Sequence, residues 1–174
     1  AQAGADCVAP SDMMDGRIKA IRCLLDADGY EQTSLMSYSA KFSSGFYGPF
    51  RIAADSAPKG EMKLTDRSSY QLAPGNYRDA LAASLRDVDE GADILMVKPA
   101  MPYLDVLSRL AAAIPTKPWA VYEVSGEYAA IECLAEKGLI DPVRGHLEAW
   151  TGMFRAGADM VITYGARNAR EWLK

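Results

Sequence analysis

Two lysines stand at the ends of short apolar runs, where an amine could carry out carbonyl chemistry. The run ILMVK ends in Lys98, and the run SLMSYSAK ends in Lys41. Short apolar runs of this kind are typical of strands that are buried on both faces of a parallel sheet. The carboxyl ends of parallel strands meet at one edge of the sheet, where α/β proteins hold their sites. We therefore expect both side chains at the same edge.

The close approach of two lysines would change their chemistry. Neighbouring strands lie about 4.8 Å apart, so the two ammonium groups would repel each other. Repulsion and burial both lower the pKa of a lysine, and a neutral amine attacks a ketone or aldehyde to form a Schiff base. A single strand-end lysine would more simply extend into solvent or bind phosphate. Two lysines at equivalent strand ends favour the Schiff-base site.

Hydroxyl and carboxyl groups stand at the other predicted strand ends. The first apolar run ends in Ser11 and Asp12, the fourth in Ser125 and the fifth in Tyr164. Asp12 could orient the amines or exchange protons near them, or it could cap the helix that follows. Ser125 and Tyr164 offer hydroxyl donors, for which a purely structural hydrogen bond is the alternative.

A long segment without periodicity, residues 42–75, follows the strand that carries Lys41. It is rich in serine, glycine, proline and aromatic residues, and it contains Arg51 and Arg67. Irregular segments longer than about 15 residues are uncommon in compact domains and usually serve as lids or binding loops. A guanidinium group suits bidentate binding of a carboxylate, although a lone loop arginine is often only solvated. We expect an active-site lid here, with a solvated insertion as the alternative.

The remaining sequence alternates between strand and helix patterns. The phrase Gly-Ala-Asp precedes an apolar run three times, and a glycine there is a helix C-cap signal. Helical patterns lie at residues 18–25, 76–88, 102–110, 127–137 and 141–157. Five strands alternating with helices predict one α/β domain over residues 1–174, with a parallel sheet. A doubly wound sheet and part of a closed (β/α)8 barrel both remain possible at this point.

The composition excludes several classes of protein. The chain has 174 residues, 49% of them hydrophobic, and a net charge of -4, which excludes a disordered chain. Basic residues are scattered, so we expect no nucleic-acid partner. No apolar stretch approaches the ~20 residues that cross a bilayer, so we expect no membrane partner. The first residues lack the features of a signal peptide, and three dispersed cysteines indicate a reducing compartment, so we expect a cytoplasmic location.

Five motifs carry a resemblance to a known family. They are VAPSDMMDGR (8–17), MSYSAKFSSGFYGPFR (36–51), MVKPAMPYLD (96–105), YEVSGEY (122–128) and AGADMVITY (156–164). Together they resemble porphobilinogen synthase, also called 5-aminolevulinate dehydratase. The resemblance covers essentially the whole chain, but only the C-terminal part of the family. It implies an α/β fold that is a partial (β/α)8 TIM barrel, with about five C-terminal β/α units and the first three strands absent.

The family resemblance also implies an activity and residue roles. The enzyme is a lyase (a hydro-lyase) that condenses two molecules of 5-aminolevulinate into porphobilinogen, in tetrapyrrole and heme biosynthesis. Lys98 would form the Schiff base with the substrate that supplies the propionate side, and Lys41 would be the second active-site lysine. Ser125 and Tyr164 would hold the carboxylate of the first substrate. The carboxylate of the second substrate would be held by Arg51, Arg67 and Gln71. The remaining pocket lining would consist of Ser11, Asp12, Tyr47, Phe50 and Tyr122.

The same resemblance sets expectations for metals and partners. The family uses zinc or magnesium, with ligands on the third strand and its loop, so no metal ligand is expected in this segment and no organic cofactor. Cys7, Cys23 and Cys133 do not match the family's cysteine triad, and the single histidine, His146, is expected on a helix face. Ala83 stands where many bacterial members have a glutamate for an allosteric magnesium, which argues against that site. The resemblance implies a homo-octamer for the full-length protein. We expect the 174-residue piece to be inactive by itself.

Two other functions remain to be weighed. One is a Schiff-base class I aldolase on a similar barrel, against which the second lysine and the loop arginines argue, because an aldolase needs one lysine. The other is a non-catalytic barrel fragment that acts in assembly. The retention of every residue that Schiff-base chemistry needs argues against it.

Overall fold

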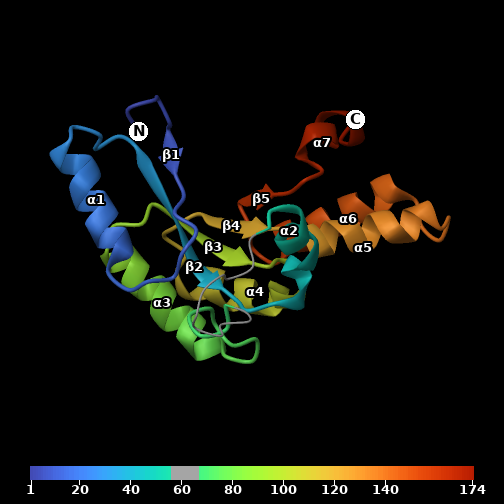
Figure 1. Cartoon of the computed structure of the whole chain (residues 1–174), viewed down its shortest axis with the longest axis horizontal. Helices are drawn as coiled ribbons and strands as arrows, with labels where there is room; N and C mark the ends of the chain where they lie inside the picture. Colours follow the sequence, from blue (N-terminus) through green and yellow to red (C-terminus); the bar gives the residue numbers. More distant parts are fainter. Residues whose placement is uncertain (56–66) are drawn as a thin grey trace.

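The computed structural model describes residues 1–55 and 67–174 (Figure 1). Its strands are β1 (Cys7–Val8), β2 (Ser34–Lys41), β3 (Ile94–Lys98), β4 (Trp119–Tyr122) and β5 (Met160–Ile162). Its α-helices are α1 (Arg17–Ala27), α2 (Gly48–Ala53), α3 (Tyr77–Asp89), α4 (Leu104–Ala113), α5 (Ser125–Glu136), α6 (Pro142–Arg155) and α7 (Ala166–Trp172). Two 3-10 turns, η1 (Gly45–Tyr47) and η2 (Met101–Tyr103), lead into α2 and α4.

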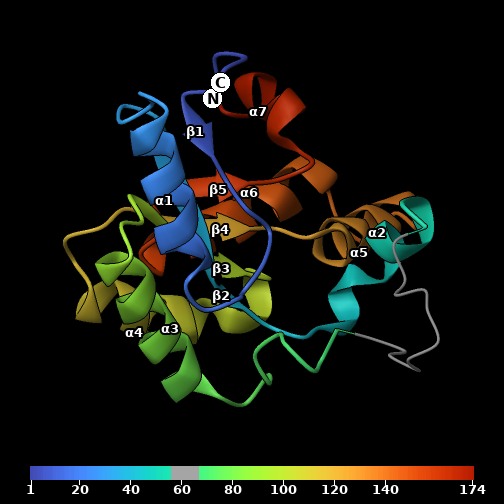
Figure 2. The same ribbon diagram turned by 60° about the vertical axis from the view of Figure 1, so that its left-hand side comes forward.

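The order of the strands decides between the two folds that the sequence left open. All pairs are parallel, and the sheet order is β1-β2-β3-β4-β5. A doubly wound sheet reverses its strand order at a switch point, whereas a (β/α)8 barrel keeps neighbours in chain order. Figures 1 and 2 show α1, α3 and α4 along one side of this sheet. The prediction of a partial TIM barrel with five β/α units is confirmed.

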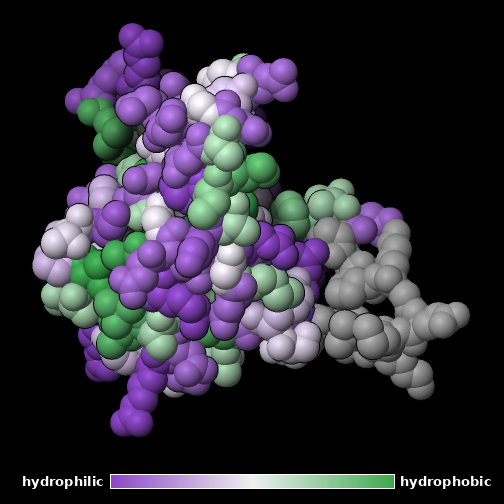
Figure 3. All heavy atoms as spheres, turned by 90° about the vertical axis from the view of Figure 1, so that its left-hand side faces the viewer, coloured by the Kyte–Doolittle hydropathy of each residue, from purple (hydrophilic) through white to green (hydrophobic). Residues whose placement is uncertain are grey.

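The core lies mainly between the sheet and its helices. Alternate strand residues face this layer, among them Leu35, Leu95 and Val97, all fully buried. The intervening residues form a smaller cluster on the opposite, inner side, with Tyr38, Met96 and Ala120 at its centre. Outside this core, the face shown in Figure 3 is largely hydrophilic, with hydrophobic residues gathered in smaller areas. None of the helices in the described residues is long and apolar enough to cross a membrane.

Most predicted helix ends have the expected caps. The side chain of Asn76 accepts a hydrogen bond from the Asp79 amide (3.2 Å), and that of Asp141 accepts one from the Arg144 amide (2.8 Å). Helix α5 begins at Ser125, two residues before its predicted start. Helix α7 was not predicted, because its few apolar residues give too short a periodic pattern.

The long irregular segment contains more structure than its sequence indicates. The sequence predicts no periodic element in residues 42–75, but η1 and α2 occupy residues 45–53. Ser44 caps η1 by accepting a hydrogen bond from the Phe46 amide (3.1 Å), and Pro49 stands in the first turn of α2. The part of this segment at residues 56–66 lies outside the described residues.

Candidate active site

Lys41 and Lys98 lie opposite each other at the carboxyl ends of β2 and β3. They are register partners in the parallel pairing of the two strands. Lys41 is only 4% exposed, and Lys98 is partly buried. The two amines therefore share one edge of the sheet, on its inner side.

A β-bulge aims Lys41 at this inner side. Three residue steps along β2, from Ser37 to Ala40, match two steps along β3, from Leu95 to Val97. One extra residue in a strand reverses the face on which every later side chain stands. Without the bulge, Lys41 would face the helices. With it, the side chain stands beside the lysine of β3.

The surroundings of the two lysines favour their neutral forms. Burial lowers the pKa of Lys41 from 10.5 to about 8, helped by the charge of Arg67 and opposed by that of Asp12. Burial also lowers the pKa of Lys98 to about 8, and the charges of Lys41 and Arg67 add to the effect. A useful fraction of each amine is thus unprotonated near neutral pH, as nucleophilic attack requires.

Each amine has distinct neighbours. The Lys41 Nζ donates to the carbonyl oxygen of Ser11 (3.3 Å) and to its Oγ (3.2 Å). The Lys98 Nζ lies 3.9 Å from the ring centroid of Tyr122 and 5.7 Å from that of Tyr47. Burial, followed by the neighbouring Tyr164, raises the pKa of Tyr122 to about 12, so this phenol stays protonated beside the Lys98 amine.

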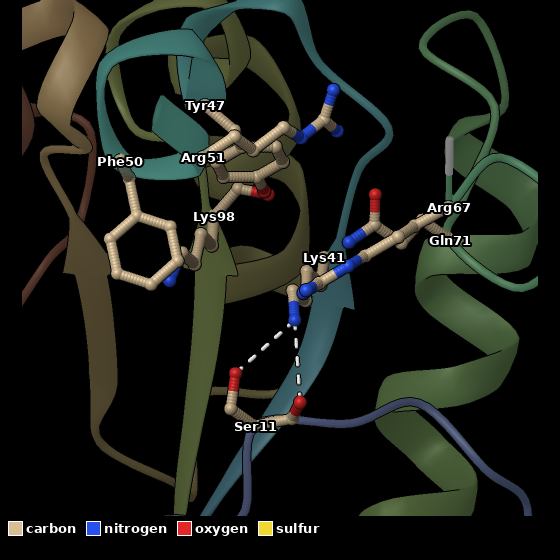
Figure 4. A pocket seen from close by; sticks show the side chains of 8 residues that line it. All are labelled: Ser11, Lys41, Tyr47, Phe50, Arg51, Arg67, Gln71 and Lys98. Atoms are coloured by element: carbon tan, nitrogen blue, oxygen red, sulfur yellow. Dashed lines mark hydrogen bonds between the residues drawn. The ribbon is translucent and has the colours of Figure 1, made fainter. Parts of the chain in front are cut away.

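Two adjacent cavities of similar volume, about 170 and 190 Å³, open at this edge. Both are lined by Ser11, Tyr47, Phe50 and Lys98; the first adds Lys41, Arg51, Arg67 and Gln71, and the second adds Tyr38, Tyr122, Val124, Ser125 and Tyr164. Figure 4 shows the first cavity, with Arg51 on one side, Arg67 and Gln71 on the other, and the lysines between them. Such an arrangement can hold two small molecules side by side, each next to one amine.

The first cavity has the chemistry of an anion site. Its lining includes two lysines and two arginines, and no carboxylate among the described residues. The side-chain oxygen of Gln71 is buried without a hydrogen-bond partner in the described structure. Buried polar atoms in proteins are rarely left unpaired, so this oxygen is a ready acceptor for a ligand donor.

The start of the long segment is docked on α5. The Phe50 amide donates to the Oγ of Ser125 (3.0 Å), and the Tyr47 hydroxyl donates to the carbonyl oxygen of Phe42 (3.0 Å). Gly126 permits this contact, because a Cβ there would lie 2.4 Å from the backbone oxygen of Phe46. Local backbone packing thus positions the aromatic wall that both cavities share.

Asp12 is the one predicted site residue that lines neither cavity. Its carboxylate accepts a hydrogen bond from the Met14 amide (3.1 Å) and pairs with Arg17 (3.1 Å). The helix that follows, α1, has Gly16 as its N-cap and no side-chain cap, so the capping alternative is wrong, and Asp12 instead holds the turn that precedes this helix. Its charge still acts on the Lys41 amine by raising its pKa, so its influence on the site is electrostatic.

Sequence reasoning missed Tyr38 and Glu127. The Tyr38 ring centroid lies 5.6 Å from the Lys41 Nζ and 5.1 Å from the Lys98 Nζ. A mid-strand tyrosine gives no signal by itself, because it stands three residues before the strand end at which site residues are expected. Glu127 was placed only as the start of a helix, yet it is fully buried next to the site.

His146 lies on α6 and away from both cavities. It is fully buried, and its Nε2 lies 2.7 Å from the carboxylate of Glu132. Its ring stacks on Tyr128 and Trp172. Among residues 1–55 and 67–174, no three His, Cys, Asp or Glu side chains come together in a way that could hold a metal ion.

Fold and site together define a class: part of a (β/α)8 barrel in which two amines of lowered pKa stand side by side, an arrangement that can form Schiff bases with small carbonyl compounds. Comparison with known proteins identifies the family. Residues 1–172 match the family model described as delta-aminolevulinic acid dehydratase. The chain belongs to this family.

Individual relatives agree with this assignment. The chloroplastic delta-aminolevulinic acid dehydratase of Physcomitrium patens is 52% identical over 99% of this chain and 39% of its own length. The relative from Synechococcus elongatus is 49% identical over 99% of this chain and 52% of its own length. The crystal structure of the Toxoplasma gondii enzyme, in complex with the reaction product porphobilinogen, superposes with a TM-score of 0.92 at 50% identity, covering 98% of this chain and 47% of that one. The chain thus spans about half the length of these relatives, or less.

The relatives correct one prediction. Those from Physcomitrium patens, Chlamydomonas reinhardtii and Glycine max are each named chloroplastic, so the prediction of a cytoplasmic location is wrong. It rested on the dispersed cysteines, which indicate a redox condition and do not separate one reducing compartment from another.

Proposed function

We propose that the whole protein is a porphobilinogen synthase, a lyase of the hydro-lyase type that condenses two molecules of 5-aminolevulinate into porphobilinogen. The observation that carries the proposal is the pair of adjacent cavities, each containing a lysine whose pKa is lowered to about 8. An aldolase needs one such amine. Two amines and two places for a carboxylate suit a reaction that joins two identical keto acids.

The second cavity would bind the substrate that supplies the propionate side. The neutral Lys98 amine attacks the ketone carbon, and the loss of one water leaves a protonated imine. Ser125 and Tyr164, whose side chains line the same cavity, would hold the carboxylate. The Tyr122 phenol, protonated at neutral pH, lies against the reacting amine.

The first cavity would bind the other substrate. Arg51, Arg67 and Gln71 would hold its carboxylate, with Lys41 beside the ketone. Residues 42–75 would cover the site as a lid, of which the part at residues 45–53 is docked on α5. In this arrangement Asp12 tunes the charge on Lys41 from outside the cavity.

Metal and assembly are further parts of the proposal. The family depends on a metal ion in general. By the family resemblance, the zinc or magnesium ion would be bound by ligands on the third strand of the complete barrel and its loop, outside the five strands described above. The octamer is proposed for the whole protein by its membership of the family.

Reductive trapping tests the function. The protein is incubated with 5-aminolevulinate, reduced with borohydride and digested, and the modified lysine is identified by mass spectrometry. We expect the label at Lys98 and its loss in Lys98→Ala, with no change in the surface variant Lys137→Ala. A label spread over surface lysines, or its absence from Lys98, would overturn the proposal.

A further inference from the structure

Beneath the two cavities, a single buried carboxylate joins two segments of the chain. Glu127 lies in the first turn of α5 and is 0% exposed. Its Oε2 accepts hydrogen bonds from the amides of Val124 (2.6 Å) and Ala100 (3.3 Å). Its Oε1 accepts one from the amide of Met101 (2.5 Å). Hydrogen bonds to an ionised acceptor are about twice as strong as neutral ones.

The three donors come from the two segments that carry site residues. Ala100 and Met101 follow the Schiff-base candidate Lys98 by two and three residues, and Val124 directly precedes Ser125. We propose that Glu127 is a positioning residue, which holds the end of β3 and the start of α5 at a fixed separation and so keeps Lys98 at its place in the cavity. The inference rests on the proposed function for its meaning, but the clamp can be tested without the substrate.

The chemistry of the site explains why a glutamate is needed. Three backbone N–H groups point at the two carboxyl oxygens, so both oxygens must act as hydrogen-bond acceptors. A glutamine would turn an N–H₂ group toward one of these donors, and a buried donor left without an acceptor destabilises the folded arrangement. An aspartate keeps the charge but is one methylene shorter, so it cannot reach both segments from the same backbone position.

Other charged groups surround the carboxylate. Burial raises the pKa of Glu127 to about 7, the three amides oppose this, and the nearby Glu123 adds to it. From η1 and η2, the phenols of Tyr47 and Tyr103 also face it, and its charge contributes to raising their pKa values. A proton on Glu127 would replace one acceptor by a donor and weaken the clamp.

The first test measures lysine reactivity with a carbonyl reagent that is unrelated to the substrate. Formaldehyde with cyanoborohydride methylates neutral amines, and mass spectrometry gives the rate at each lysine across a pH series. In Glu127→Gln we expect Lys98 to become more hydrated, so that its pKa rises by about one unit and its labelling at neutral pH falls about tenfold. The exposed Glu136→Gln, the same change on the same helix, should have no effect.

Lys41 provides an internal control within the same molecule. Its environment is set by burial, Arg67 and Asp12, and its amine is held by Ser11, whereas the amides that donate to Glu127 belong to Ala100, Met101 and Val124. A positioning role therefore lowers the ratio of Lys98 to Lys41 labelling. A ratio that stays unchanged, whether both rates fall equally or neither falls, would overturn the clamp.

A second measurement needs no variant. In the unmodified protein, the amide resonances of Ala100, Met101 and Val124 should shift with pH along one shared titration curve, with its midpoint near pH 7. The Leu95 amide, which donates within the sheet region to the Pro118 carbonyl oxygen, serves as the reference that does not follow this curve. Three amides that titrate independently, or not at all, would contradict the proposal. Neither outcome depends on 5-aminolevulinate, so a failure of the clamp and a failure of the proposed function are distinguishable.

Discussion

At the scale of single residues, the reactivity of the site depends on two amines that repel each other. Burial contributes most to the lowered pKa of Lys98, and the charge of Lys41 comes second. Only the neutral amine is a nucleophile, so reactivity rises with pH through about 8 instead of through the ordinary lysine value of 10.5. The same two effects explain why a lysine can end a buried strand.

Replacement of Lys41 by methionine isolates the second effect. Lys41→Met keeps most of the side-chain volume and removes the charge, so the pKa of Lys98 should rise while remaining below 10.5, because burial is unchanged. The labelling of Lys98 at pH 7 should fall several-fold, since each unit of pKa changes the neutral fraction about tenfold. Reductive methylation over a pH series, read by mass spectrometry, gives the midpoint directly.

The control is Lys137→Met, which removes an exposed charge at the C-cap of α5, the end opposite to Ser125. It should leave the Lys98 curve in place. A Lys98 midpoint that does not move, or moves downward, in Lys41→Met would show that the two charges are not coupled.

Strand-end reasoning located part of this site, and the rest came from family motifs or was missed. Lys41 and Lys98 follow from the rule that parallel strands present their carboxyl ends at one edge. Gln71 and Tyr47 could be named only through the resemblance, because nothing in their local sequence marks a cavity wall. Tyr38 was missed because it stands three residues before the end of β2, where the strand-end rule places no site residue.

At the scale of elements, the docking of η1 and α2 on α5 gives the cavities their common wall. This contact has little room: a Cβ at Gly126 would overlap the backbone of Phe46 at 2.4 Å. The neighbouring hydrogen bond from the Phe50 amide to Ser125 fixes the same contact on the other side. The wall is therefore set by backbone packing, and side-chain choice is secondary.

Gly126→Ala should separate these elements. Because the overlap is with backbone, which cannot rotate away, we expect a loss of about 1–3 kcal/mol in the free energy of unfolding and weaker binding of keto acids. Urea unfolding and the yield of borohydride-trapped Lys98 are the measurements. Gly45→Ala on η1 is the matched control, as a Cβ there meets nothing within 4 Å. If both variants behave alike, the close approach at Gly126 has no role.

Sequence periodicity predicted the five strands and most helices, and it failed where tertiary contacts decide. The α2 helix was hidden in a segment rich in glycine and proline, and it is held by its contacts with α5. The bulge in β2 could not be seen in the sequence. Every residue from Leu35 to Phe42 is partly or fully buried, so polar and apolar residues do not alternate in a way that would mark where the side chains change face. The caps at Asn76 and Asp141 were predictable, since capping is local.

At the scale of the whole molecule, the five strands form an open sheet whose inner face is only partly covered. Met36, Ile94 and Met160 stand partly exposed around the inner cluster. In a closed barrel of eight strands, layers of side chains from all strands fill this interior. Both edge strands, β1 and β5, also present unpaired backbone groups within the described residues. The partly exposed inner face and the two open edges therefore bear on what this chain can do by itself.

We expect the 174-residue chain alone to form the Schiff base at Lys98 but not to release porphobilinogen, because an open sheet leaves the bound ketones exposed to water and lacks the remaining barrel strands. Fusion to the portion of the Synechococcus elongatus relative outside the matched 52%, which the family resemblance identifies as its N-terminal part, should restore product formation. The pyrrole product can be followed by its colour reaction with an aromatic aldehyde in acid. Lys98→Ala in the fusion is the control, and it should abolish the restored activity. Product formation by the chain alone at the rate of the fusion would show that five strands suffice.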